Sequence, residues 1–291
     1  MRHLASGFKL THVGVDWLSC SANDRVGAAH LWEVGERLLN RAKLEGERPT
    51  RWHGHGYDGY RAGGISVGSR KDSTLVRLSG KEACYEWEHA VSAADNVSRL
   101  DLAVDVQFER PVSALAVQLY RDSGHVSSRG GRPRTRTLVI CSDGGQTCYL
   151  GRRVSDAMGR LYDKGVESAT APAGTLWRYE VEYKRGPALF AAQTLSRAES
   201  VEGAISSTVA SWFGARGGRV WGFSPELALI QWSRSPTSDA NRLSWLARCV
   251  RPTVVALTET EGYYRVSTAL GWPQLYQGPL QSAVQTPVQE D

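Results

Sequence analysis

The sequence predicts an α+β fold in which a central, largely antiparallel sheet carries one charged face and packs helices on its other face. Three segments of the chain alternate polar and apolar residues with the period of a β-strand. Segments with helical spacing of apolar residues lie between strand segments, and the charged strand faces are left uncovered. These observations indicate a sheet with helices on one side and a smaller helical region toward the C-terminus.

The alternation sorts charged and apolar side chains onto opposite faces of the three strands. The charged face collects Arg99, Asp101, Asp105, Arg160, Tyr162, Lys164, Arg178, Glu180, Glu182 and Lys184. Strands paired in this way would bring carboxylates close together, and like charges facing each other are unfavourable. A divalent cation between Asp101, Asp105, Glu180 and Glu182 would relieve the repulsion, and such oxygen ligands suit Mg²⁺, Mn²⁺ or Ca²⁺. The alternative is a solvated sheet face with ordinary cross-strand ion pairs.

Tyr162 lies between two cations on the second of these strands. Because opposite charge favours the ionised phenolate, Arg160 and Lys164 predict a Tyr162 that loses its proton easily. Such a phenol suits a nucleophile that attacks a phosphate. Tyr149, in the preceding strand, is the alternative nucleophile, since it could face the same pocket.

The N-terminal half begins with a strand at residues 12–22 and a helix from Asp24 to Leu44, capped by Asn23 or Asp24. A glycine- and aromatic-rich segment at 51–64 is predicted to form loops or hairpin ends. A hairpin at 65–80, a helix through Ala94, the first charged strand and a helix from 111 to 124 follow. A second hairpin, around residues 143–144, leads to the strand of Tyr162.

Beyond Lys184 the pattern becomes mainly helical. Residues 188–213 have helical spacing, a Trp-rich segment with Trp221 and Trp232 is interpreted as core, and a helix runs through 243–250. One or two short helices follow at 252–271, and the Pro- and Gln-containing tail at 274–291 is predicted to be disordered. The expected organisation is a catalytic domain at 1–187, a helical region at 188–273 packed on it, and the tail.

Basic residues favour a nucleic-acid partner. The formal net charge is +5, the pI is near 9.0, and 29 of the 35 basic residues are Arg, whose planar fork binds phosphate. A GC-rich coding sequence explains the Arg content equally well. The cluster Arg129, Arg132, Arg134 and Arg136 predicts a flexible clamp for a DNA backbone, with a solvated loop as the alternative.

Five cysteines without a CxxC pair predict reduced thiols in a cytoplasmic protein. No stretch is apolar enough to span a membrane, and the N-terminus lacks the continuous apolar core of a secretory signal. We therefore expect a cytoplasmic protein with no membrane partner; that the cell is a bacterial host is implied only by the family resemblance given next.

Five blocks carry a family resemblance. In chain order they read VDWLSCSA, VRLSGKEA, SRLDLAVDV, YLGRRVSDAMGRLYDKG and WRYEVEYK, from Val15 to Lys184. In this order and spacing the sequence resembles the Rep_trans replication initiation factors of rolling-circle plasmids and filamentous phages, and related relaxases. The resemblance implies a metal-dependent enzyme that nicks DNA and joins itself to the DNA through a tyrosine.

Carried over by motif, the resemblance implies Tyr162 as the nucleophile and the acids of the RxDxxxD and RxExE blocks, Asp101, Asp105, Glu180 and Glu182, as ligands of Mg²⁺ or Mn²⁺. Arg160, Lys164 and Arg178 would stabilise charge on the reacting phosphate. The family's YxGSR block reads YLGRR here, so Arg152 replaces its Ser, and we expect Arg152 and Arg153 to contact DNA.

The pair His53 and His55 invites comparison with the two-histidine motif of another class of tyrosine nickases. That motif flanks a bulky apolar residue on a strand, whereas Gly54 is central here. A surface or DNA-contacting loop is therefore favoured over a pair of metal ligands.

The function that we expect is strand-specific nicking at a replication origin, presented as a single strand or an extruded hairpin. The products would be a 5′-phosphotyrosine and a free 3′-hydroxyl that primes a host polymerase, with a host helicase and single-strand binding protein as further partners. A homodimer is left open. The alternatives are a relaxase of a mobile element, a non-covalent metal-dependent nuclease, and a DNA-binding regulator without catalysis.

Overall fold

The computed structural model describes residues 7–126, 135–142, 144–218, 251–262 and 265–266. These residues form two compact units; α8 (Arg251–Glu261) lies in the second, and all other elements lie in the first. No described helix is long and apolar enough to cross a membrane.

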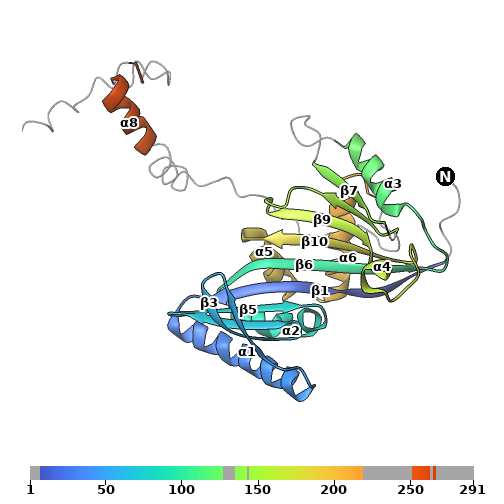
Figure 1. Ribbon diagram of the computed structural model, residues 1–291, viewed down its shortest axis with the longest axis horizontal. Coiled ribbons are helices and arrows are strands. Elements are labelled where there is room, and N and C mark those ends of the chain that lie inside the picture. Colours follow the sequence, from blue (N-terminus) through green and yellow to red (C-terminus); the bar gives the residue numbers. More distant parts are fainter. Residues whose placement is uncertain (1–6, 127–134, 143, 219–250, 263–264, 267–291) are drawn as a thin grey trace, which may run out of the picture. The chain divides into compact units, whose positions relative to one another are not determined.

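The first unit is built on an antiparallel sheet whose described strands follow the order β2-β3-β4-β5-β1-β6-β10-β9-β8-β7. The strands are β1 (Phe8–Ala22), β2 (Thr50–Gly54), β3 (Tyr57–Ala62), β4 (Ile65–Arg70), β5 (Ser73–Ser79), β6 (Asn96–Phe108), β7 (Arg136–Ile140), β8 (Gln146–Leu150), β9 (Ala157–Asp163) and β10 (Leu176–Lys184). Figure 1 shows the long strands β1 and β6 side by side in the middle of this sheet. The predicted α+β class is confirmed.

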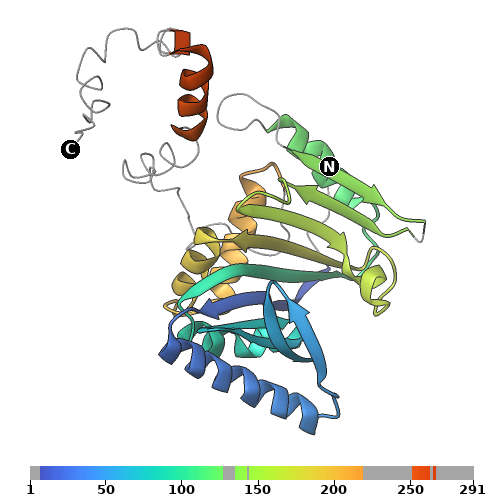
Figure 2. The same ribbon diagram turned by 60° about the vertical axis from the view of Figure 1, so that its left-hand side comes forward.

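Helices cover the apolar face of the sheet (Figure 2). The described helices of this unit are α1 (Arg25–Leu44), α2 (Lys81–Ser92), α3 (Leu115–Asp122), which continues into the short 3₁₀ helix η1 (Ser123–His125), α4 (Lys164–Ser168), α5 (Gly186–Leu195) and α6 (Val201–Gly214). All but α4 and η1 bury apolar side chains against the sheet; α4 is a single turn at the end of β9. The prediction of one helix-covered face and one charged face is thus confirmed.

The core lies between these helices and alternate residues of the central strands. Leu100, Leu102 and Val104 of β6 are fully buried, and Tyr179 of β10 packs edge-on against Phe213 of α6 with ring centroids 5.2 Å apart. Burial of such side chains is the main contribution to stability.

Gly159 of β9 makes room for a helix at the sheet surface. A Cβ atom at this position would lie 2.2 Å from the ring of Trp212 in α6, so a larger residue would push α6 off the strand that carries Tyr162. The glycine therefore fixes how closely α6 supports β9 from behind.

Several predicted boundaries differ from the structure. The segment predicted as helical at 188–213 is two helices, α5 and α6, separated at Ser196–Ser200, where the side chain of Ser200 caps α6 by accepting from the backbone of Gly203. The helix expected from 111 is shorter, since α3 begins at Leu115. Asp24 caps α1 as predicted. The predicted elements at 221–250, the tail at 274–291 and Arg129, Arg132 and Arg134 lie outside the described residues.

Candidate active site

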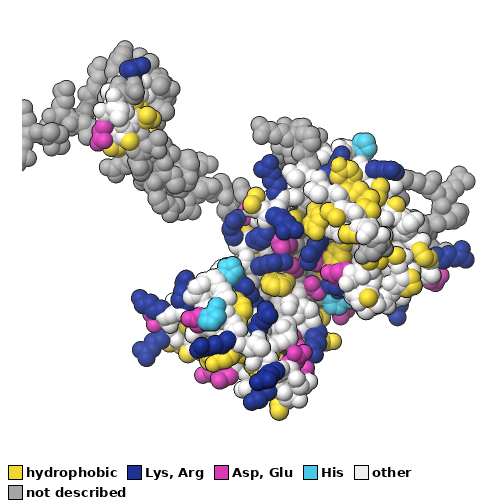
Figure 3. All heavy atoms as spheres, in the orientation of Figure 1, with side chains coloured by type: hydrophobic (Ala, Val, Ile, Leu, Met, Phe, Trp, Pro, Cys, Tyr) yellow, Lys and Arg dark blue, Asp and Glu magenta, His cyan; other side chains and the backbone are white. Residues whose placement is uncertain are grey.

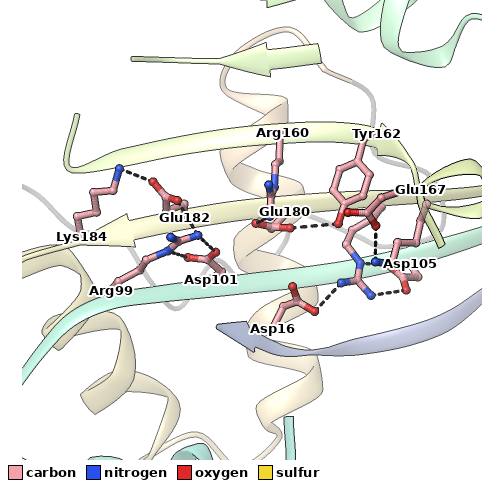
Figure 4. Close-up of polar contacts among 12 residues, drawn as sticks. Asp16, Arg99, Asp101, Asp105, Arg160, Tyr162, Glu167, Glu180, Glu182 and Lys184 are labelled. Atoms are coloured by element: carbon pink, nitrogen blue, oxygen red, sulfur yellow. Dashed lines mark hydrogen bonds and ion pairs between the residues drawn. The ribbon is translucent and has the colours of Figure 1, made fainter. Parts of the chain in front are cut away.

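The three charged strands are neighbours, in the order β6-β10-β9, and their register aligns the predicted residues in rows (Figure 4). Asp105 lies opposite Arg178, which lies opposite Tyr162. In the next row Glu180 lies opposite Arg160, and in the one after it Asp101 lies opposite Glu182. Since directly opposed residues point to the same face, the predicted polar residues of these strands share one side of the sheet.

Arg178 is the most enclosed cation of this face. Its Nε lies 2.5 Å from Asp105 Oδ1 and its Nη2 2.8 Å from Asp105 Oδ2, and its Nη1 donates to Asp16 Oδ1 at 2.5 Å. The planar guanidinium thus satisfies two carboxylates at once, which a lysine could not do with the same geometry.

Asp16 is a site residue that the sequence reasoning missed. The pairing of β1 with β6 shifts register between Val15 and Trp17, so Asp16 is the extra residue of a β-bulge. A bulge re-aims a side chain, and here it turns Asp16 toward Arg178. His12, also on β1 and opposite Asp105, is a second missed neighbour; burial lowers its pKa, opposed by the charge of Asp105.

The Tyr162 hydroxyl points at an acid. It donates to Glu180 Oε2 at 3.4 Å, and its ring lies beside Arg160 and Lys164, with Cζ of Arg160 5.3 Å and Nζ of Lys164 5.8 Å from the ring centroid. The sequence had predicted that Lys164 continues the strand, and this prediction is wrong. Lys164 is the first residue of α4, because the buried Asp163 side chain caps that helix and also accepts from the Gly174 backbone at 2.6 Å.

The expectation that Tyr162 loses its proton easily is not met by this arrangement. Burial raises the pKa of Tyr162 well above its ordinary value, and the charge of Glu180 raises it further. Arg178 and Arg160 oppose this rise but do not overcome it. Both guanidinium groups are already engaged by carboxylates, so little of their charge is left for the phenol.

Glu180 is the buried acid at the centre of the site. Arg160 Nη2 lies 2.6 Å from its Oε1, but out of hydrogen-bond alignment, so that within the described structure Oε1 is buried without a hydrogen-bond donor. Burial raises the pKa of Glu180 to about 8; Asp101 and Asp16 raise it as well, while Arg160 lowers it. A carboxyl poised near neutral pH is suited to accepting or releasing a proton.

The remaining predicted metal ligands are paired with cations. Arg99 holds Asp101 through two hydrogen bonds of 2.9 and 2.5 Å and also lies 2.8 Å from Glu182, which Lys184 contacts in addition. Burial raises the pKa of Asp101. Across the described parts of the chain, no three His, Cys, Asp or Glu side chains are grouped so that they could hold a metal ion, and metal binding here stays a prediction.

A pocket of about 300 Å³ opens beside Tyr162 on the side of β8. Tyr149 lines it together with Tyr162, Arg160 and Thr147, so both candidate nucleophiles border the same space. Tyr149 lies opposite Arg160 and therefore one row away from Tyr162, with Cζ of Arg153 6.0 Å from its ring centroid. The volume is at the lower end of small-molecule sites.

The predicted DNA-binding arginines have different surroundings. Arg152 and Arg153 are exposed in the turn after β8, and Arg153 lies near Tyr149, which lines the pocket. Arg136 begins β7 with its Cζ 4.6 Å from the ring centroid of Tyr120 in α3, on the helix-covered side of the sheet. The structure therefore does not bring Arg136 to the face that carries Tyr162.

The two histidines of the glycine-rich segment lie in the β2–β3 hairpin. His53 contacts Asp58 on the neighbouring strand, and His55 occupies the connecting turn with a φ of 53°. Both are exposed, as expected of a surface segment, but His53 lies on a strand and not in the loop that the sequence had favoured.

Comparison with known proteins finds one matching family model and a similar solved structure. Residues 95–215 match a family model described as Rep_trans, replication initiation factor. Among solved structures the chain is similar to the rolling circle replication initiator protein from Geobacillus stearothermophilus, at 19% identity, a TM-score of 0.49, and coverage of 83% of this chain and 96% of that one. No curated protein sequence matches the chain. The resemblance that the motifs predicted is therefore confirmed over residues 95–215, which match the Rep_trans family of replication initiation factors.

Proposed function

We propose that this protein is a rolling-circle replication initiator that nicks one DNA strand by transesterification, with Tyr162 as the nucleophile. The observation that carries the proposal is the placement of the Tyr162 hydroxyl. It lies at a buried acid with a raised pKa, beside a pocket, and in one row with Arg178. The match of residues 95–215 to replication initiation factors supports it.

In the proposed reaction the Tyr162 oxygen attacks the phosphorus of the scissile phosphodiester. The bond from phosphorus to the 3′ oxygen breaks, a bond from phosphorus to the tyrosine oxygen forms, and the released 3′ oxygen takes up a proton. Glu180 Oε2, which accepts the hydroxyl in the resting site, would take the phenol proton once Glu180 is ionised. Because the phosphodiester is conserved as a 5′-phosphotyrosine, the same site can reseal the strand.

The cations of the face would stabilise the charge that builds on the reacting phosphate. Arg160 borders the pocket and has a buried Nε without a hydrogen-bond partner in the described structure. Lys164 Nζ lies 5.8 Å from the centroid of the Tyr162 ring, and Arg178, opposite Tyr162, holds Asp105 and Asp16. Preorganised donors of this kind lower the barrier because they need no rearrangement during the reaction.

A divalent cation near Glu180 is a separate proposal, because the described acids are paired with cations and are not grouped as a metal site. Glu180 Oε1 is buried without a hydrogen-bond donor in the described structure, and Asp101 and Asp16 lie close enough to raise its pKa. We propose that these oxygens, with Asp105 and Glu182 at the edge, would hold Mg²⁺ or Mn²⁺. When bound, such an ion polarises a non-bridging phosphate oxygen.

The free 3′-hydroxyl would then prime a host polymerase in the cytoplasm, with host helicase and single-strand binding protein acting downstream. The site requires an unpaired strand, so a single-stranded or extruded origin is the proposed substrate. A relaxase would perform the same chemistry at a transfer origin.

The nucleophile is tested with a single-stranded oligonucleotide labelled at its 3′ end, because the 5′-phosphotyrosine keeps the 3′ portion of the cleaved strand on the protein. We expect wild-type protein to carry the label through a denaturing gel, and Tyr162→Phe to lose the adduct completely while keeping its DNA affinity. Tyr149→Phe is the matched control and should retain the adduct. Trypsin separates the two candidates, because Tyr162 falls in the peptide Leu161–Lys164 and Tyr149 in Thr137–Arg152.

An adduct that persists in Tyr162→Phe, or that maps to Thr137–Arg152, would make Tyr162 the wrong assignment. Nicked DNA without any labelled protein would indicate a non-covalent nuclease, and binding without cleavage would indicate a regulator.

The metal proposal has its own test with two readouts. Chelation with EDTA should stop nicking, and Mn²⁺ should raise the melting temperature of wild-type protein but not of Glu180→Gln, since a ligand that binds only the folded state stabilises it. Full nicking in EDTA, or equal Mn²⁺ stabilisation of both proteins, would contradict metal binding at Glu180.

A further inference from the structure

The charged face continues past β1 onto four strands that no part of the proposed site uses. Thirteen positions of β2–β5 point to this side: Thr50, Trp52, Gly54, Tyr57, Gly59, Arg61, Ser66, Gly68, Arg70, Ser73, Leu75, Arg77 and Ser79. None is acidic, and three are Arg. The opposite face of β3, β4 and β5 packs on α1, so the side that carries Arg61 and Arg77 is the one that α1 leaves uncovered.

One row of directly opposed residues crosses seven strands of the sheet. It runs through Thr50, Arg61, Ser66, Arg77, Ser19, Arg99 and Lys184. We call the four cations Arg61, Arg77, Arg99 and Lys184 the cationic row. The first three stand on every second strand, about 10 Å apart, with small Ser side chains between them.

The two ends of the cationic row differ in their partners. At one end Arg99 and Lys184 contact Glu182 in the candidate active site. At the other end Arg61 and Arg77 form no ion pair with any acid in the described parts of the chain. Their positive charge is therefore available to an external anion, and the row joins that charge to the active site.

Aromatic rings accompany the arginines on this surface. Cζ of Arg77 lies 5.3 Å from the ring centroid of the half-buried Trp52, and Cζ of Arg70 lies 5.1 Å from that of Tyr57, which is itself buried. A Cβ on Gly68 would meet the Trp52 ring at 2.8 Å, so glycine lets the indole lie flat on the strands. Cations alternating with flat rings are the usual surface for a single nucleic-acid strand.

We infer that the cationic row, together with Trp52 and Arg70, binds the phosphates and bases of single-stranded DNA leading to or from the nick site. The inference rests on the proposed function. A single strand is favoured over a duplex because only unpaired bases can stack on Trp52, and the described strands β2–β5 present a sheet surface and not a helix that could enter a groove. In Figure 3 many dark-blue Lys and Arg side chains lie on the face seen in that view.

The test measures binding of a fluorescent single-stranded oligonucleotide by Tyr162→Phe protein, so that no covalent product forms. The strip variant carries Arg61→Gln and Arg77→Gln. The matched control carries Arg37→Gln and Lys43→Gln, two exposed cations of α1 on the opposite side of the sheet, and loses the same charge. Melting temperatures of both variants check that the fold is intact.

We expect the strip variant to bind about 10- to 100-fold more weakly and the control to stay within about twofold of the parent. Loss of two phosphate contacts should also lower the slope of log affinity against log salt by about 1.4. Trp52→Leu should weaken binding without changing that slope, because stacking releases no counterions.

Equal affinities of strip and control variants would overturn the inference, as would a strip variant that loses duplex binding as strongly as single-strand binding. The proposed function is judged separately, by the covalent adduct of protein with Tyr162 intact. If no covalent adduct forms but the strip variant binds DNA more weakly, the binding surface is supported and the nicking proposal is wrong. If the adduct forms but the strip variant binds normally, the nicking proposal is supported and the binding surface is wrong.

Discussion

The charged face of the sheet has two halves that differ in whether their charged side chains are paired with opposite charges. On β6, β10 and β9 the acids Asp101, Asp105, Glu180 and Glu182 all lie against cations. On β2–β5 the same alternation of residues puts Arg on the face without a single acid. The first half neutralises itself, and the second needs an anion from outside.

The comparison shows that alternation alone predicts where charge lies but not what it does. Enclosed pairs lose solvation, and removing one partner leaves a buried charge without compensation. Exposed arginines retain their hydration and contribute little to stability. We therefore expect substitutions in the half with paired charges to lower stability, and substitutions in the acid-free half to weaken DNA binding with little loss of stability.

The largest expected effect on stability comes from Arg178. Arg178→Met would leave Asp105 buried and unpaired and remove the partner of Asp16, which should lower the free energy of unfolding by about 3–5 kcal/mol. Arg61→Met, the same substitution at an exposed arginine of the acid-free half, should lower it by less than about 1 kcal/mol. Urea denaturation of both variants makes the measurement. Equal losses would mean that the two halves do not differ as described.

Much of the fold followed from the sequence because strand alternation is a local property. The segments containing Asp101, Tyr162 and Glu180 have period-2 patterns, and pairing them placed all three on one face. Helices α1 and α2 and the two hairpins were also predicted, since caps and turns are encoded by neighbouring residues.

The remaining site features depend on contacts that alternation does not encode. Asp16 reaches Arg178 only because a bulge interrupts the pairing of β1, and Asp163 ends β9 by capping α4, which moves Lys164 off the strand. The acidity of Tyr162 was predicted from its sequence neighbours, but its pKa is governed by burial and by Glu180, which lies on another strand. Charge neighbours along a chain are a poor guide where cross-strand partners neutralise them.

A smaller effect that sharpens the comparison is the pH dependence of stability. The pKa of Glu180 is raised from 4.5 to about 8 in the folded protein, so between these values the folded state holds a proton that the unfolded state has lost. Its contribution to stability is therefore fully present below about pH 4.5 and disappears as pH rises through about 8.

We expect the unfolding free energy of wild-type protein to fall between pH 6 and pH 9 more steeply than that of Glu180→Gln, whose amide does not titrate. Glu33→Gln, on the exposed surface of α1, should follow the wild-type profile. Denaturation at a series of pH values, without divalent ions, compares the three proteins. Parallel profiles for wild type and Glu180→Gln would show that Glu180 is ionised throughout this pH range. In that case Glu180 is a permanent ion-pair partner of Arg160 and has no proton to exchange with Tyr162.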